Sequence, residues 1–444
     1  MKPGTAYKFG VCLLWFISIL ALCYLPKQYE FSQLALYGGI AFLSYFYILW
    51  KPDLVPVRWL VAIAIGVRIL IIPSFPLLSD DIYRFIWDGR LWHLGINPYS
   101  HLPIHWTSEG IMSEGLFSLL NSPEYYTIYP PFAQGIFYLS TLISSTDFRA
   151  EAIIMKSIHC LFEIGALRVL WLLLKEYKLP AERWALYALN PLIIVEVLAN
   201  VHHEGVMIFF TLLCLLLIAK NKYYIAGISM ALAIATKLLP LLLCPLLFFY
   251  LKGKGRWQFT LATILVTLVL FGPILINEEM VSHLLDSADL YVRSFEFNAS
   301  IYYFLNEIGQ RIYGYNIIGT LGPCLKVLTI ISIIYLALKA RALQGPANLP
   351  SLLLGTYLVF VLFSSTVHPW YILLLIGLAP LTPFRFPIIW SFLILGTYIN
   401  YSFNPYQEQI WMVVIEYIVV ALVGIVECRK FIQKGKGLLP IFEK

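Results

Sequence analysis

Long uninterrupted apolar segments, separated by short loops that carry most of the charged side chains, constrain the fold of this chain more than any other feature. A run of about 20 apolar residues spans the hydrocarbon core of a bilayer as a helix. Strands of a membrane barrel would instead alternate apolar and polar residues over about ten positions. The segments therefore predict an all-α polytopic membrane protein. The candidate spans are residues 9–26, 33–50, 59–76, 152–174, 184–200, 205–219, 223–237, 238–251, 257–276, 315–338, 351–367, 369–383, 386–401 and 409–427.

The composition excludes the water-soluble alternatives. Hydrophobic residues make up 60% of the 444 residues and charged residues only 13%, whereas soluble domains carry about 25% charged residues. A soluble globular domain, a disordered chain or a nucleic-acid-binding module does not have this balance. No small-x-small cleavage site follows residues 9–26, so we expect this segment to be retained as the first transmembrane helix.

The distribution of basic residues predicts the topology. Residues 131–145 form one further apolar stretch, which could cross the membrane or dip into it. If this stretch dips and the N-terminus is cytoplasmic, 20 of the 31 Lys and Arg residues lie in cytoplasmic loops or tails, as the positive-inside rule requires. If it crosses, every later basic loop points outward. We therefore expect about 14 crossings, with both termini in the cytoplasm.

Two extracytoplasmic loops, at about 77–151 and 277–314, are much longer than the other loops. Long loops held by a rigid scaffold are where binding and catalytic residues concentrate. The remaining loops are short, and no soluble domain is appended to them. We therefore expect any chemistry on the extracytoplasmic face.

The first long loop opens with an acidic segment, residues 79–90. Read as a helix, it places Asp81, Arg84 and Asp88 on one face and apolar side chains on another. This pattern predicts an amphipathic juxtamembrane helix in the interface, with a carboxylate at the mouth of the membrane. The alternative is structural: Asp80 and Asp81 cap the helix, while Arg84 and Asp88 only pair with each other.

A series of short motifs, in one order along residues 77–371, resembles the GT-C glycosyltransferases that use polyprenyl-phosphate sugars, and most of all their multi-pass mannosyltransferases. One difference is that two helices precede the helix that feeds the acidic loop, where these proteins usually have one. The motifs are Asp80-Asp81, Trp87-Asp88-Gly89-Arg90, Gly95-Ile96-Asn97-Pro98-Tyr99, Tyr129-Pro130-Pro131, Asn190-Pro191-Leu192, Ala199-Asn200-Val201-His202-His203-Glu204, Thr236-Lys237-Leu238-Leu239-Pro240, Phe297-Asn298-Ala299-Ser300 and His368-Pro369-Trp370-Tyr371.

The resemblance implies a membrane enzyme of cell-envelope glycan biosynthesis. It would transfer a sugar, with mannose as the expectation, from a polyprenyl-phosphate donor to a lipid-linked or glycan acceptor, with inversion. The active site would be extracytoplasmic, and compact loops favour a bacterial inner membrane. We expect a single integral membrane domain with a helical hairpin at 1–58, a GT-C-like catalytic core at 59–371, and C-terminal helices with a basic cytoplasmic tail at 372–444.

The acidic pair supplies the candidate base. A carboxylate beside the acceptor hydroxyl can take its proton, and cations near the phosphate stabilise the leaving group. Asp81 is the first choice as the base, with Asp80 as its helper or substitute. No cofactor is firmly implied, although a divalent cation could bridge the two carboxylates.

Lys237 is the main candidate for contact with the lipid phosphate, because a lysine inside apolar sequence is expensive and usually has a partner or a function. The alternative is that it only snorkels to the headgroups. In contrast, Glu163 and Glu196 are expected to be packing polar residues between helices. The further substrate-binding candidates are Arg84, Asp88, Arg90, Tyr129, His202, His203, Glu204, Asn298, His368, Trp370 and Tyr371.

A transporter or a lipid or glycolipid flippase is the alternative function. Transporters often show internal repeats and paired broken helices. No convincing repeat relates the two halves of this chain, and its charged residues gather in the outer loops. The enzyme is therefore favoured, with membrane lipids, the donor and the acceptor as its partners.

Overall fold

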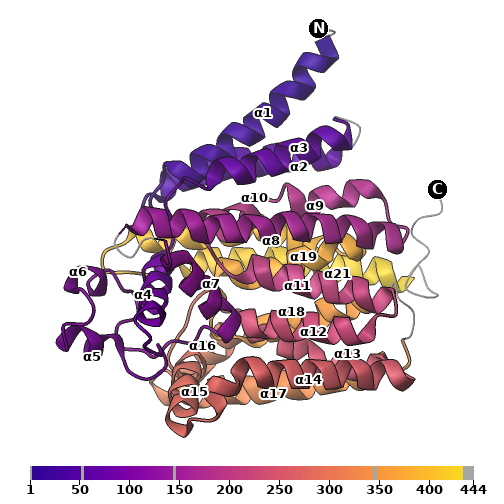
Figure 1. The fold of residues 1–444 in the computed structure, drawn as a ribbon. Helices are drawn as coiled ribbons and strands as arrows, with labels where there is room; N and C mark the ends of the chain where they lie inside the picture. Colours follow the sequence, from indigo (N-terminus) through magenta and orange to yellow (C-terminus); the bar gives the residue numbers. More distant parts are fainter. Residues whose placement is uncertain (1–2, 52–54, 144–146, 344–347, 434–444) are drawn as a thin grey trace.

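The computed structural model describes residues 3–51, 55–143, 147–343 and 348–433. Within these ranges the chain is helical, without a β-strand, and one isolated bridge joins Phe297 to Thr366. The long helices of the bundle run side by side, while α1 leans away from them at one edge (Figure 1). The predicted all-α polytopic membrane protein is confirmed at this level.

The helices fall into four groups along the chain. The first three are α1 (Pro3–Tyr24), α2 (Phe31–Trp50) and α3 (Val57–Ile71). The acidic loop contains α4 (Asp81–His93), α5 (Pro103–Ser108), α6 (Glu114–Phe117) and α7 (Pro131–Thr141). The centre contains α8 (Phe148–Glu176), α9 (Ala185–Ala188), α10 (Pro191–Ile194), α11 (Glu204–Ala219), α12 (Tyr223–Thr236), α13 (Cys244–Tyr250) and α14 (Gly253–Leu275). The last group contains α15 (Glu278–Arg293), α16 (Ile301–Tyr313), α17 (Ile318–Ala340), α18 (Leu349–Phe363), α19 (Leu373–Leu378), α20 (Phe386–Leu393) and α21 (Ile410–Gln433).

Six short segments with 3₁₀ or π hydrogen bonding interrupt the α-helical spans. Five of them are 3₁₀ turns, and the turn at 195–199 is a π turn. They are η2 (Ala181–Trp184), η3 (Val195–Ala199), η4 (Leu239–Leu243), η5 (Pro369–Ile372), η6 (Ala379–Leu381) and η7 (Ile394–Ser402).

Five described helices are long and apolar enough to cross a membrane, namely α2, α8, α14, α17 and α21. A sixth span would be the pair Pro191–Ala199 and Glu204–Ala219, which is bent by 115° at its break. Several other predicted spans are shorter or interrupted; α12, for example, has only 14 residues. The structure thus has the helices of a multi-pass membrane protein, and the count of about 14 crossings stays a prediction.

Helix α7 begins and ends near the same end of the bundle. The ring of Tyr129, just before α7, lies 5.0 Å from that of Phe85 on α4, and Phe148 at the start of α8 lies 6.0 Å from Tyr83 on α4. With 11 residues, α7 is about 16 Å long, about half the hydrocarbon thickness. This length and placement agree with the predicted dip, and the topology of the segment stays a prediction. Residues 144 and 145 of the predicted segment lie outside the described residues, as does most of the basic tail, 434–444.

Part of the polar face of α4 is buried inside the protein, while the predicted place of this helix at the membrane interface stays a prediction. Arg84 and Asp88 are 3% and 0% exposed, and they pair at 3.0 Å. Arg84 donates to the carbonyl oxygens of Ser122 and Tyr125, both at 2.9 Å. The loop before α7 therefore covers this face, because its carbonyl groups and polar side chains satisfy the buried charges.

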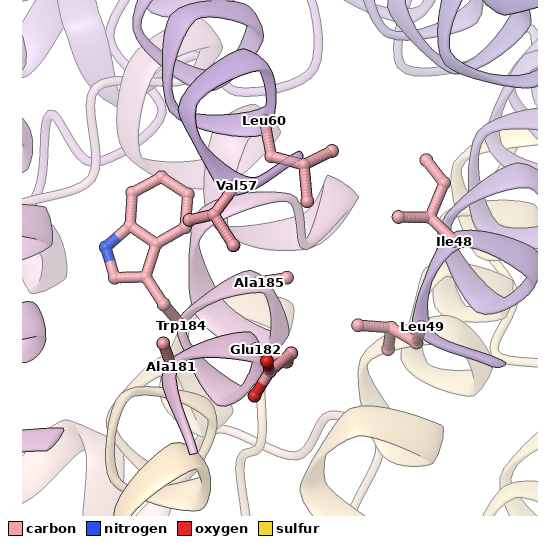
Figure 2. A pocket seen from close by; sticks show the side chains of 8 residues that line it. All are labelled: Ile48, Leu49, Val57, Leu60, Ala181, Glu182, Trp184 and Ala185. Carbon is pink, nitrogen blue, oxygen red and sulfur yellow. The ribbon is translucent and has the colours of Figure 1, made fainter. Parts of the chain in front are cut away.

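The end of the bundle that carries α4, α5 and α6 also carries α15 and α16 (Figure 1). A small pocket lies away from this end, between α2, α3 and the η2–α9 segment (Figure 2). Its lining is apolar apart from one carboxylate, so it has no groups suited to a phosphorylated sugar. The lining residues are Ile48, Leu49, Val57, Leu60, Ala181, Glu182, Trp184 and Ala185.

Candidate active site

Asp81 is the first residue of α4, and its carboxylate is held from two sides. The Asn121 amide donates to Oδ1 at 2.6 Å, and Nε2 of His202 lies 3.7 Å from Oδ2. The side chain is 21% exposed, so a substrate hydroxyl can reach it. Asp80 precedes it at the helix N-cap, but its side chain accepts no capping hydrogen bond, and it is exposed.

The surroundings shift the pKa values of the two carboxylates in opposite directions. Burial by itself would raise the pKa of Asp81, but the contact with His202 and the hydrogen bond from Asn121 outweigh it and hold the pKa below its ordinary value. Asp80 is exposed but partly desolvated by the surrounding protein, and this desolvation together with the neighbouring charge of Asp81 raises its pKa. Asp81 is therefore the carboxylate that stays ionised and able to accept a proton.

His202 lies behind Asp81 in the break between η3 and α11. Its Nδ1 lies 2.8 Å from Oε2 of Glu196, and its Nε2 lies 3.5 Å from the hydroxyl of Ser79. The ring of Trp370 stacks on the imidazole at 3.9 Å with an interplanar angle of 29°. The ring of His202 thus has fixed contacts on both nitrogens and on one face.

A row of stacked rings continues from His202 across the site. Trp370 stacks on His368 at 4.5 Å and 8°, and His368 stacks on Phe297 at 4.5 Å and 28°. The four rings come from three regions of the chain that the Phe297–Thr366 bridge and the bend before α11 bring together.

Lys237 follows the end of α12 and forms an ion pair with Glu204, the first residue of α11. Its ammonium nitrogen also lies 5.5 Å from the ring centroid of Tyr371. The lysine is 26% exposed and the glutamate is buried, and Oε2 of Glu204 has no hydrogen-bond partner among the described residues. Lys237 therefore has an inward-facing partner, which simple snorkelling does not explain.

The structure does not bring Arg90, Asn298 or His203 to the Asp81 carboxylate. Arg90 binds Glu151 through two hydrogen bonds of 2.8 Å. The side-chain amide of Asn298 donates to Glu416 at 3.0 Å. The ring of His203 lies in an aromatic cluster, 4.8 Å from Phe85, 4.9 Å from Phe137 and 6.3 Å from Tyr129.

Arg84 and Asp88 are likewise used inside the protein. Besides pairing with Arg84, Asp88 accepts hydrogen bonds from Thr127 at 2.5 Å and Gln134 at 2.8 Å. This network connects α4 to the loop before α7 and to α7 itself. In the structure these two residues support the loop that supplies Asn121.

Sequence reasoning missed the contacts made by Asn121 and Glu196. Nothing near Asn121 in the sequence marks it, because its partner is 40 residues away. Glu196 did carry a signal, since it is a single carboxylate inside an apolar run six residues before His202. It was expected to pack between helices, and it does so while also binding His202.

The geometry gives little support to a divalent cation that bridges Asp80 and Asp81. Both oxygens of Asp81 already face nitrogen atoms, those of Asn121 and His202. Among the described residues, no three His, Cys, Asp or Glu side chains gather as a metal site.

Two comparisons with known proteins bear on this site. A family model described as "Alpha-(1->6)-mannopyranosyltransferase, N-terminal domain" matches residues 14–252. The matched range contains α4, the acidic loop, the break at 200–203 and Lys237. The search of curated proteins finds no match.

Proposed function

The chain belongs to the alpha-(1->6)-mannopyranosyltransferase family and is a membrane glycosyltransferase, and from this premise we propose that it transfers mannose from a polyprenyl-phosphate donor to a hydroxyl of a lipid-linked or glycan acceptor. The reaction would be a single inverting displacement. An inverting transfer that forms an α linkage needs a donor of β configuration. The acceptor hydroxyl that fits the family description is the one on carbon 6 of a mannose residue.

Asp81 is the proposed general base. As the acceptor oxygen bonds to the anomeric carbon, its proton passes to Asp81, and the bond to the phosphate oxygen breaks with its electron pair on polyprenyl phosphate. The observation that carries this proposal is the Asp81 carboxylate itself. It is partly exposed and held ionised by Asn121 and His202, beside the row of rings that contains Trp370 and His368.

Lys237 is the proposed contact for the donor phosphate. Its ammonium group is partly exposed and anchored by Glu204, with Tyr371 beneath it. A cation at this place would stabilise the negative charge that grows on the leaving phosphate. The rings of Trp370 and Tyr371 would then bind the sugar between phosphate and base.

The cellular setting follows from the same chemistry. Because nucleotide sugars are confined to the cytoplasm, a lipid-phosphate donor implies an extracytoplasmic active site. We propose that α4, α7 and the turn at 200–203 lie on that side of a bacterial inner membrane, with both termini in the cytoplasm. Under this proposal, residues 59–371 form the catalytic core.

The test is a transfer assay with purified protein in detergent or nanodiscs. It uses β-mannosyl-phosphoryl polyprenol as the donor and an alkyl α-mannoside as the acceptor, with neither ATP nor an ion gradient. We expect a disaccharide product with an α-1,6 linkage and release of polyprenyl phosphate. Movement of the donor across a sealed membrane without formation of a glycosidic bond would instead support a flippase.

A further inference from the structure

Glu196 is a fully buried carboxylate. It contacts His202, and His202 in turn contacts Asp81, the proposed base. Its Oε2 lies 2.8 Å from Nδ1 of His202, and Nε2 of the same ring lies 3.7 Å from Oδ2 of Asp81. A carboxylate, imidazole and second carboxylate therefore form a line from the protein core to the site. Because ionised carboxylates only accept hydrogen bonds, Glu196 favours the proton on Nδ1 and Asp81 favours a proton on Nε2, and the ring between them is held as an imidazolium.

Glu196 is itself held in place through both oxygens. The hydroxyl of Tyr398 donates to Oε1 at 2.8 Å, and the amide of Asn200 donates to Oε2 at 3.0 Å. Among the residues that the structure describes, His202 is its ion-pair partner. A buried carboxylate without a partner would be costly, so Glu196 and His202 stabilise each other's charge.

The backbone around His202 is strained in a way that maintains this contact. Val201 has φ of 65°, in the left-handed region that β-branched residues avoid. The backbone N–H of His202 donates to the carbonyl of Glu196 at 2.9 Å, and residues 195–199 form a π turn. Such strain and wide turns persist where the surrounding structure imposes them, often at functional sites. Here they turn the two adjacent histidines toward different partners, Asp81 and the aromatic cluster.

We propose that Glu196 is a positioning residue for the transfer reaction, holding the His202 imidazole with Nε2 toward Asp81 so that Asp81 remains ionised and aimed at the acceptor hydroxyl. This inference rests on the proposed role of Asp81 as the base. Glu196 does not touch the substrate and acts through His202. Trp370, stacked on the ring, prevents the imidazole from turning away.

A pH profile can report on this contact, and the other titratable groups around Asp81, His202 and Glu196 are all retained when Glu196 is replaced. Asp80 adjoins Asp81, and His368 faces it from the loop before η5. The further groups around Asp81, His202 and Glu196 are Cys23, His159, His203, Tyr398 and Tyr401.

The first variant is Glu196→Gln, assayed for transfer with β-mannosyl-phosphoryl polyprenol and an alkyl α-mannoside. Without the carboxylate, the imidazolium is less favoured, and the partly buried Asp81 loses the cation that lowers its pKa. We expect kcat to fall about tenfold or more, as when a general base loses its proper protonation state, while KM for the donor changes little. The acid limb of the kcat–pH profile should move to higher pH. Glu196→Asp, which keeps the charge, should restore part of the activity and the wild-type limb.

The matched control is Glu163→Gln on α8. Glu163 is equally buried, pairs with Arg68 at 3.1 Å and accepts a hydrogen bond from Tyr187, but it does not contact His202 or Asp81 in the structure. Its loss should lower stability without moving the acid limb. If the glutamine variants do not fold, Tyr398→Phe and Tyr187→Phe form a milder pair, since each removes one hydroxyl that donates to Glu196 or Glu163. Only Tyr398→Phe should then move the acid limb of the kcat–pH profile to higher pH.

Asp81→Asn, assayed in parallel, separates the two proposals. If Asp81→Asn is inactive while Glu196→Gln keeps wild-type kcat and an unshifted acid limb, the positioning role of Glu196 is overturned and the proposed base is not. An active Asp81→Asn enzyme would overturn the proposed base and the positioning role together. Equal shifts in the Glu196 and Glu163 variants would show a general structural effect and would also overturn the inference.

Discussion

At the scale of single residues, two adjacent aspartates have different environments. Asp81 is partly buried and bound by Asn121, whereas Asp80 is exposed and makes no capping bond. Partial desolvation and the charge of Asp81 raise the pKa of Asp80. Burial by itself would raise the pKa of Asp81, but His202 and Asn121 outweigh it and lower that pKa. Asp81 is the one of the pair whose carboxylate is held by fixed partners and remains partly open.

Replacing Asp81 with asparagine should abolish most of the activity and leave the fold intact. Asparagine keeps the shape and one acceptor oxygen but cannot take a proton, and loss of a general base costs about 10²–10⁴-fold in rate. The measurement is kcat for mannose transfer, with thermal unfolding in detergent as the control for folding. Asp80→Asn should be the milder change. If both variants keep more than about a tenth of wild-type turnover, neither aspartate is the base.

Replacing Lys237 should weaken use of the donor. A charge-assisted hydrogen bond contributes about 1.5–3 kcal/mol, so Lys237→Ala should raise KM for the donor by about 10–100-fold. The single variant also leaves Glu204 buried without its cation. The double variant Lys237→Met, Glu204→Gln removes both charges and should fold better than the single variant, with the same loss of donor binding. If the folded double variant keeps the wild-type KM for the donor, Lys237 does not bind the donor phosphate.

At the scale of elements, the packing of α4 on α7 sets the position of the site. Gly89 on α4 faces the backbone of α7, where an added Cβ would lie 2.5 Å from the carbonyl oxygen of Phe137. The Asp88 network connects the same two helices through Thr127 and Gln134. Since Asp81 is the first residue of α4, any separation of the helices would move the proposed base.

Gly89→Ala should therefore destabilise the protein and reduce activity together. Overpacking of this kind costs about 1–3 kcal/mol, and thermal unfolding of the purified protein measures it. Gly135→Ala is the matched control, because Gly135 is exposed on α7 and an added Cβ would meet nothing within 4 Å. That variant should be neutral or more stable by about 0.5–1 kcal/mol. Equal stability of the two variants would contradict the close packing of α4 on α7.

At the scale of the whole molecule, the topology is the property that connects the fold to the reaction. The α4–α6 end also carries α15 and α16, so both long loops lie at the same end of the bundle (Figure 1). Tyr129 just before α7 and Phe148 at the start of α8 both lie beside α4, which supports the prediction that the chain does not cross the membrane at α7.

Reporter fusions test this topology directly. A reporter near residue 110 or 148 should be extracytoplasmic, and one near 178 or 254 should be cytoplasmic, because the basic residues gather in the latter loops. Accessibility of introduced cysteines to a membrane-impermeant reagent gives an independent measurement. Opposite sides for positions 110 and 148 would mean that the 131–145 segment crosses, and the proposed orientation of the site would be wrong.

The membrane class, the helical fold and the order of the motifs could be read from the sequence alone, because the length and polarity of each run decide whether it prefers lipid or water. The family match confirms the glycosyltransferase that those motifs indicated. The polar partners were decided only by the tertiary structure. Arg90 with Glu151 and Lys237 with Glu204 are 61 and 33 residues apart, and no local pattern specifies such pairs.

The same limit applies to the burial of the polar face of α4. Its helical periodicity correctly placed Asp81, Arg84 and Asp88 on one face. Periodicity does not show whether that face is exposed to water or covered by a loop. The loop at 121–134 covers Arg84 and Asp88 and leaves Asp81 partly open. The sequence therefore determined which carboxylates share a face, and the fold decided which of them remains open to a substrate, since burial depends on segments far along the chain.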